Sequence, residues 1–331
     1  MKDGFVKVAA ASPIIRVADC DYNARQIIDT IREADALGVK LLVFPELTLT
    51  GVSCFDLISH RVLLEGARRA LDTVAAATAG TDMLVLVGLP LAEGALYDGE
   101  ILALPADGLL RCAALPELQV GQGRDREALE RPGAVMAGAG ATVIAQMADF
   151  PATVTSTDEA LAALKYESRR WKAGLVLAAP GKGESTTDRG WSGLCAVAEN
   201  GEVLASDEQL GAARSSLAVS EIDVQRLVNL RRGNEDFAYP DEDVPVTEWG
   251  GALSGTTLTR AFNKHPQLPA DSAALPAYVE RMLDIQVSGL VKRMEYAHLD
   301  HCVVGISGGV DSTLCVMVCA MAVRRMGLPS D

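Results

Sequence analysis

The chain has 331 residues, a formal net charge of −14, and a hydrophobic content of 49%. This length and composition predict a globular protein with two domains, or with one large domain and part of another. The acidic balance argues against nucleic-acid binding, because phosphate contacts need clustered Lys and Arg. No stretch resembles a signal peptide or reaches transmembrane length, so we expect a cytoplasmic protein.

The first three-quarters of the chain alternates short apolar runs with amphipathic segments. In chain order we expect a strand at 6–10, a helix at 22–37, a strand at 41–44, a helical region at 56–78, strands at 83–87 and 142–145, a helix at 158–172 and a strand at 175–178. Hairpins are predicted at Asp107-Gly108 and Asn200-Gly201, because glycine adopts the positive φ that tight turns need. The alternation indicates an α/β layered fold.

Regular patterning stops between residues 233 and 275, where acidic runs, prolines and glycines predict a linker over the surface. It resumes with a helix at 276–296, a buried strand at 302–306 and an apolar helix at 313–325. The carboxy-terminal part therefore predicts a separate helix-strand-helix unit.

The string SGGVDST, residues 307–313, connects that strand to the last helix. Small residues let backbone N–H groups approach phosphate oxygens, and the helix N-terminus adds about half a positive charge. A Walker loop is excluded because no Gly-Lys-[Ser/Thr] follows. A plain strand-to-helix turn capped by Asp311 or Ser312 is the structural alternative. We favour a phosphate-binding loop.

Residues 304–313 resemble the loop of the N-type ATP pyrophosphatases, and residues 285–290 narrow the resemblance to glutamine-dependent NAD(+) synthetases. Upstream, residues 44–51 resemble the nitrilase strand end that carries the catalytic Glu, and residues 183–188 resemble a segment of the actinobacterial enzymes. The matching segments stand in the family's order and come from both of its domains.

This resemblance implies three regions. Residues 1–232 would form a nitrilase-like α-β-β-α sandwich, which is an incomplete and degenerate glutaminase domain, and residues 233–275 would be the linker. Residues 276–331 would form the first helix-strand-helix of a doubly wound adenine-nucleotide α-hydrolase-like domain. Since the sequence ends one helix after the loop, we expect either a fragment or a second chain that completes the synthetase half.

The resemblance also implies the chemistry of a carbon–nitrogen ligase in NAD biosynthesis. In that family ATP adenylylates nicotinic acid adenine dinucleotide, and ammonia released from glutamine then displaces AMP. The ATP phosphates, together with Mg²⁺, would be held by Ser307, Gly308, Gly309, Asp311, Ser312 and Thr313. No separate protein metal site is expected. The expected assemblies are a homo-oligomer or a complex with the chain that completes the synthetase.

A nitrilase glutaminase uses a Cys nucleophile, a Glu base and a Lys that stabilises the oxyanion. Glu46 matches the base, but the Lys position reads Glu117, whose carboxylate would repel an oxyanion. Loss of one oxyanion donor costs about 2.7–4 kcal/mol in the transition state. The segment expected to carry the nucleophile, residues 124–141, contains no Cys and is shorter than the missing strand and helix require. We therefore predict an inactive glutaminase and an internal deletion.

Cysteines outside the expected nucleophile position leave alternatives open. Cys54 could substitute for the nucleophile, but a buried structural thiol is favoured because nothing places a base around it. Cys315 and Cys319 are one helical turn apart and could be a ligand pair, but no third ligand lies nearby in sequence and core packing is favoured.

Three functional hypotheses follow from these departures. The first is an ammonia-dependent NAD synthetase subunit that cannot use glutamine. The second is a pseudoenzyme, a glutaminase-like domain that assembles or regulates an intact synthetase. The third is a truncated gene product.

Overall fold

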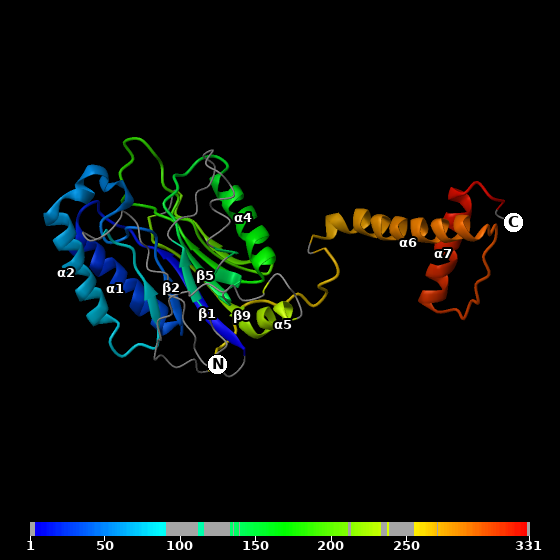
Figure 1. The fold of residues 1–331 in the computed structure, drawn as a ribbon, viewed down its shortest axis with the longest axis horizontal. Coiled ribbons are helices and arrows are strands. Elements are labelled where there is room, and N and C mark those ends of the chain that lie inside the picture. The colour runs from blue at the N-terminus through cyan, green and yellow to red at the C-terminus, as the bar shows by residue number, and fades with distance from the viewer. Residues whose placement is uncertain are drawn as a thin grey trace. The chain divides into compact units, whose positions relative to one another are not determined.

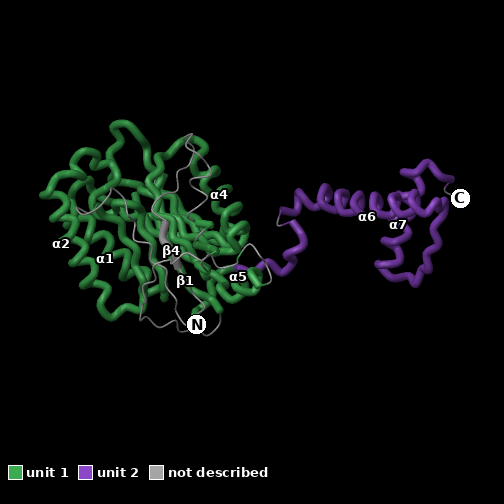
Figure 2. The backbone as a smooth tube through the Cα atoms, in the orientation of Figure 1, with its two compact units in different colours: residues 1–260 green, residues 261–331 purple. Residues whose placement is uncertain are grey.

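The computed structural model describes residues 4–90, 112–115 (by their backbone), 133–134, 136–138, 140–210, 213–232, 237, 255–269 and 271–329. The chain divides into two compact units, residues 1–260 and 261–331 (Figure 2). Among the helices in the described part of the chain, none is long and apolar enough to cross a membrane.

Two β-sheets form the centre of the first unit (Figure 1). The first sheet, in spatial order, contains β3 (Leu84–Leu86), β2 (Leu41–Val43), β1 (Phe5–Ser12) and β9 (Ser216–Asp223). The second contains β4 (Cys112–Leu115), β5 (Val143–Met147), β6 (Gly174–Ala178), β7 (Cys195–Glu199) and β8 (Glu202–Asp207). Each sheet has parallel strands with antiparallel strands added at one edge. In the first sheet β9 pairs antiparallel with β1. In the second sheet β7 pairs antiparallel with β6, and β8 with β7.

Apolar side chains alternate along β1 between two cores, because successive residues of a strand point to opposite faces. Val6 and Val8 pack with Val143 and Val176 of the second sheet, so the two sheets share one buried layer. Ala9 belongs to the core on the opposite face.

Helices cover the outer faces of both sheets (Figure 1). On the first sheet, α1 (Cys20–Ala36) and α2 (Arg61–Ala77) bury an apolar stripe that includes Ile27 and Ile31. On the second sheet, α4 (Ser156–Trp171) buries Leu164 and Trp171. The order of layers is therefore helix, sheet, sheet, helix, which confirms the predicted α-β-β-α sandwich.

The expected helical region at 56–78 is broken in the structure. A 3₁₀ segment, η1 (Val52–Ser59), contains Phe55 at φ +45°, and α2 starts only after His60, whose backbone is extended. Positive φ is unfavourable for a bulky residue, so the break is imposed by the tertiary contacts of this loop. The predicted hairpin at Asn200-Gly201 is confirmed, because both residues have positive φ and join β7 to β8. The hairpin expected at Asp107-Gly108 lies outside the described residues.

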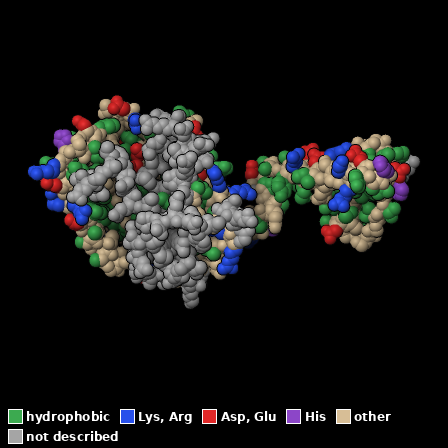
Figure 3. All heavy atoms as spheres, in the orientation of Figure 1, with side chains coloured by type: hydrophobic (Ala, Val, Ile, Leu, Met, Phe, Trp, Pro, Cys, Tyr) green, Lys and Arg blue, Asp and Glu red, His purple; other side chains and the backbone are tan. Residues whose placement is uncertain are grey.

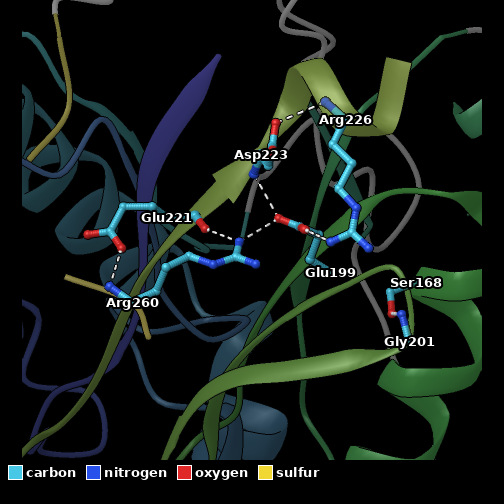
Figure 4. Close-up of polar contacts among 7 residues, drawn as sticks. All are labelled: Ser168, Glu199, Gly201, Glu221, Asp223, Arg226 and Arg260. Carbon is cyan, nitrogen blue, oxygen red and sulfur yellow. Dashed lines mark hydrogen bonds and ion pairs between the residues drawn. The ribbon is translucent and has the colours of Figure 1, made fainter. Parts of the chain in front are cut away.

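Within the predicted linker, Thr259 and Arg260 are hydrogen-bonded to strands of the first unit (Figure 4). Arg260, whose side chain is 8% exposed, donates from Nη1 to Glu199 at 2.8 Å and to the Glu221 carbonyl at 2.8 Å. Glu221 pairs with Lys7 on the neighbouring strand at 3.2 Å and accepts from the Thr259 and Arg260 N–H groups. Burial alone raises the pKa of Glu221, but these hydrogen bonds outweigh burial and hold that pKa below its ordinary value.

The second unit is a helical hairpin. Its short η3 (Ser272–Ala274) leads into α6 (Leu275–Ala297), which packs on α7 (Val310–Arg325). The buried contacts come from Val287, Met294, Val318 and Ala322. The strand expected at 302–306 does not form, because the described part of this unit offers no neighbouring strand whose N–H and C=O groups it could pair with.

Large apolar side chains remain exposed on the second unit, and Figure 3 shows hydrophobic atoms on its visible face. Val303 is 93% exposed and Val310 is 85% exposed. Each fully buried large aliphatic side chain contributes about 1.5–3 kcal/mol to stability. Because the buried cluster between α6 and α7 is small, the helix pair gains little stability from its own core.

Candidate functional site

Glu46 lies where the chain leaves β2, and its half-buried side chain stands at the carboxyl end of the first sheet. Its backbone N–H donates to the Ala148 carbonyl at 3.3 Å, just beyond β5 of the second sheet. The ends of β2 and β5 are therefore joined at this residue. The chain that leaves β3 passes close to this turn at Gly88. A side chain is excluded there, because a Cβ at residue 88 would lie 2.5 Å from the Leu47 nitrogen.

The turn after Glu46 is closed by its own hydrogen bonds. Leu47 has φ +53°, and its carbonyl accepts the N–H groups of Thr50 at 3.0 Å and Gly51 at 2.7 Å. The Thr48 hydroxyl donates to the Pro45 carbonyl at 2.5 Å. A left-handed conformation costs a leucine about 1–2 kcal/mol, so these bonds hold the loop in a strained but defined geometry.

Glu184 holds the next part of the same loop. Its buried carboxylate accepts from the Val52 N–H at 2.9 Å and from the Ser53 N–H and hydroxyl at 3.0 and 2.5 Å. The Ser53 hydroxyl oxygen in turn accepts from the Ser185 N–H at 2.7 Å. The sequence offered the segment 183–188 only as a family likeness. The structure gives Glu184 a physical role, which is to fix the loop that follows Glu46.

Cys54 is 2% exposed in this loop. Burial raises the pKa of its thiol, the hydrogen bond with Thr50 lowers it, and the negative charge of Glu184 raises it further, with a net increase. A thiol with a raised pKa holds little thiolate, which is the nucleophilic form. The structure therefore favours the interpretation of Cys54 as a structural thiol.

In the first unit, the cysteines with described side chains are Cys20, Cys54 and Cys195, and all three are buried. None of these three fits an accessible nucleophile. Glu117 and the stretch 116–132 lie outside the described residues, so the predicted Lys-to-Glu replacement stays a prediction.

The region of the expected deletion connects two neighbouring strands. β4 runs parallel to β5, with Leu115 opposite Gln146. Residues 136–141 turn into β5 through a bond from the Ala141 N–H to the Met136 carbonyl at 2.8 Å. The Gln146 side chain is 1% exposed and donates to Glu167 of α4 at 3.1 Å. In the second sheet β4 is therefore hydrogen-bonded directly to β5. The family resemblance leads us to expect a further strand between these two strands in the sequence.

Residues 307–313 form an exposed turn at the start of α7. Gly308 has φ +85°, a conformation that favours glycine, and no atom lies within 4 Å of where its Cβ would be. The Ser312 and Thr313 hydroxyls both donate to the Gly309 carbonyl at 3.0 Å, and the Ser307 and Ser312 hydroxyl oxygens are 3.3 Å apart. The structure therefore brings the predicted loop residues together.

This turn fits a phosphate group. The first N–H groups of α7 have no partner within the helix, and its dipole favours an anion at that end. Asp311, in the first turn, carries the same sign as phosphate and is better suited to a cation shared with it. Among the described residues no group of three His, Cys, Asp or Glu side chains could hold a metal. A Mg²⁺ ion here would therefore need phosphate oxygens among its ligands.

No family model matches the chain. Curated relatives do match it: among them, the glutamine-dependent NAD(+) synthetases of Mycobacterium tuberculosis and Mycobacterium leprae are each 29% identical to it over 98% of this chain and 56% of their own length. The chain is therefore similar to the glutamine-dependent NAD(+) synthetases over nearly all of its length. It spans about half the length of the curated relatives it matches. The alignment covers 384 positions against a chain of 331 residues, so more than about 50 positions of the relative have no counterpart here.

Solved structures agree on the fold. The NAD(+) synthetase of Cytophaga hutchinsonii superposes with a TM-score of 0.52 at 18% identity, over 97% of this chain and 52% of that one. The synthetase of Acinetobacter baumannii, solved with ADP, gives 0.53 at 14%, over 96% and 57%. An amidase of the nitrilase superfamily from Nesterenkonia gives 0.52 at 17%, over 69% and 94%. These similarities confirm the nitrilase-like fold of the first unit.

Proposed function

We propose that the chain is part of a NAD synthetase that amidates nicotinic acid adenine dinucleotide at the expense of ATP. The similarity to curated synthetases over 98% of the chain is the observation that carries this proposal. In it, residues 1–232 are a degenerate glutaminase domain, residues 233–275 a linker and residues 276–331 the start of the synthetase domain.

The loop at the start of α7 would hold the ATP phosphates. Backbone N–H groups around Gly308 and Gly309 would donate to the phosphate oxygens, and the Ser307, Ser312 and Thr313 hydroxyls lie beside them. Asp311 would face a bound Mg²⁺. That ion would neutralise phosphate charge and stabilise the leaving pyrophosphate.

A Gly308→Ala substitution tests this role. Alanine at φ +85° is strained by about 1–3 kcal/mol, so the loop would leave the geometry that presents its N–H groups. We expect ATP affinity, measured by equilibrium dialysis, to fall about 5- to 150-fold. Gly289→Ala, at an open position on α6 whose φ is not positive, is the matched control and should leave ATP affinity unchanged. Equal affinity in the two variants would contradict the role of Gly308.

The glutaminase half is proposed to be impaired. Glu46 keeps its place at the sheet end, but Cys54 and the other described thiols of that unit are buried, and the Lys position reads Glu117. Without an activated thiolate, glutamine cannot form the covalent acyl intermediate that releases ammonia. Free ammonia would then be the nitrogen source.

An assay of NAD formation with ammonium or glutamine, run with this chain alone and with a second chain carrying the synthetase half, tests the proposal. We expect NAD from ammonium only when the second chain is present. NAD formation driven by glutamine alone would refute the impaired glutaminase, and no NAD under any condition would refute the synthetase role.

A second candidate function is assembly or regulation of an intact synthetase. The structure of the first unit favours it. Both sheets and their shared core are present, so the unit could serve as an assembly surface, whereas its described cysteines are buried and do not fit a nucleophile. Under this function the chain would co-purify with a full-length synthetase as a homologous subunit and show no turnover of its own.

A further inference from the structure

A short segment of the predicted linker, residues 256–260, lies on the surface of the first unit and outside its helices and strands. We call this segment the strap. Leu258 is 41% exposed, whereas the Arg260 side chain is only 8% exposed. At the other end of the strap, the Thr256 hydroxyl donates to the Phe5 carbonyl at 3.1 Å. The strap is therefore an exposed segment that inserts one charged side chain into the unit.

The strap ends on two buried carboxylates (Figure 4). One oxygen of Glu221 accepts the N–H and the hydroxyl of Thr259 at 3.1 and 2.8 Å, and the other accepts the Arg260 N–H at 3.0 Å. Glu199 accepts from the Arg260 guanidinium at 2.8 Å. Hydrogen bonds to ionised groups are stronger than neutral ones. The two carboxylates thus bind a Thr-Arg step through its backbone, its hydroxyl and its charge.

Each carboxylate also has a cation that belongs to the body of the unit. Lys7 on β1 lies 3.2 Å from Glu221, and Arg226 on α5 lies 3.3 Å from Glu199. The Asp223 N–H donates to Glu199 at 2.7 Å. A buried charge is costly when it has no partner, but departure of the strap would leave two carboxylates facing two cations. The electrostatics of the site therefore permit the strap to leave.

We propose that Glu199 and Glu221 form a binding site for a Thr-Arg segment, and that the strap fills this site reversibly while the first unit stays folded. Segments with few buried apolar contacts open locally at a lower free-energy cost than core strands do. The strap is such a segment. In contrast, β1 beneath it is paired on both sides, with β2 and with β9, so it opens only with the whole unit.

Release of the strap would change the connection to the second unit. While the strap is bound, the chain that leads to α6 leaves the first unit at Ala261. Release adds the residues of the strap to that connection, and the effective concentration of a tethered unit depends on the length of its tether. The site therefore lets the chain lengthen or shorten its linker. This role does not depend on the proposed function.

Trypsin cleavage of the wild-type chain tests the proposal, because trypsin must bind the Arg260 side chain in its own pocket. Exposed Lys264 reports an open linker, and buried Lys7 reports unfolding of the whole unit. Each initial rate is divided by the rate at the same site in the unfolded chain. We expect cleavage after Arg260 to be at least about tenfold slower than after Lys264 and at least about tenfold faster than after Lys7.

Two results of this assay would overturn the proposal. A rate after Arg260 equal to that after Lys7 would show that the strap opens only with the whole unit. A rate equal to that after Lys264 would show that the strap is not bound. Neither comparison requires a variant to fold.

Thr259→Ala removes the hydroxyl bond to Glu221 and changes only the strap. Loss of a hydrogen bond to a charged group should speed cleavage after Arg260 about tenfold, with the rate after Lys7 unchanged. Thr257→Ala is the matched control, because Thr257 is exposed and has no hydrogen bond to the described part of the chain. Equal cleavage rates in the two variants would contradict binding of the Thr259 hydroxyl at this site.

Recognition can also be measured in trans, by fluorescence anisotropy of a labelled peptide with the sequence of residues 256–262. The Arg260→Ala chain should bind it at least about tenfold more tightly than the wild-type chain, whose site is already occupied. The same peptide carrying Arg260→Ala should bind neither chain. Equal binding by the two chains, or of the two peptides, including no binding at all, would overturn the assignment of this site.

Discussion

Replacing Arg260 with alanine is expected to destabilise the first unit by about 3 kcal/mol, the low end of the cost of breaking a buried ion pair, because Glu199 would keep only the half-exposed Arg226 as a cationic partner. The Glu199 side chain is 1% exposed, and its Oε2 accepts from Arg260 at 2.8 Å. The Glu221 carbonyl would lose its Arg260 donor as well. Urea unfolding followed by circular dichroism measures the change.

Arg226→Ala is the matched control, because Arg226 contacts the other oxygen of Glu199 at 3.3 Å (Figure 4). Its side chain is 50% exposed, and pairs that reach solvent contribute only about 0–1 kcal/mol. If Arg226→Ala proves as destabilising as Arg260→Ala, the anchor does not depend on the buried contact.

A Gly183→Ala substitution should have a comparable effect, through the loop beside Glu46. Gly183 has φ +106°, and a Cβ there would lie 1.8 Å from the Ile15 carbonyl oxygen, a backbone atom. Backbone strain of about 1–3 kcal/mol adds to an overpacking cost of about 1–3 kcal/mol. The displaced neighbour would be Glu184, so the ties to Val52 and Ser53 should weaken too.

Thermal unfolding and hydrogen exchange of residues 51–54 would measure both effects. Gly38→Ala is the control, because Gly38 also has positive φ, at +75°, but has open space where the Cβ would stand. It should therefore cost only the backbone strain, about 1 kcal/mol or slightly more. A Gly183→Ala variant no less stable than Gly38→Ala would show that the close approach to Ile15 is not a constraint.

The layered fold could be predicted because its information is local. Alternation along β1 and helical spacing over α1 each place apolar residues on one face, and the two cores then follow. The Asn200-Gly201 hairpin was predicted for the same reason, since its turn chemistry lies within two residues.

Features that depend on distant partners were not predictable. Arg260 stands in a stretch that reads as linker, and only the fold brings it to Glu199 and Glu221. Arg231 donates to the carbonyls of Ala137, Ala141, Trp171 and Lys172, and no local pattern of the sequence indicates these contacts. The strand expected at 302–306 did not form for the opposite reason: its apolar residues are present, but the described part of the second unit contains no strand that could pair with it.

The candidate site also contains some features that local sequence predicts and others that depend on distant partners. The seven residues of the loop at 307–313 are contiguous, so their convergence follows from sequence alone. The role of Glu184 depends on residues more than a hundred positions away and could be recognised only from the folded loop.

The most direct test of a synthetase relative with an impaired glutaminase is glutamate release from glutamine by the purified protein. Glu46→Gln serves as the comparison. We predict no release above the uncatalysed rate for either form, and no covalent adduct on any thiol by mass spectrometry. Steady glutamate release that the Glu46→Gln variant abolishes would contradict the account, because it would require a working nucleophile beside Glu46.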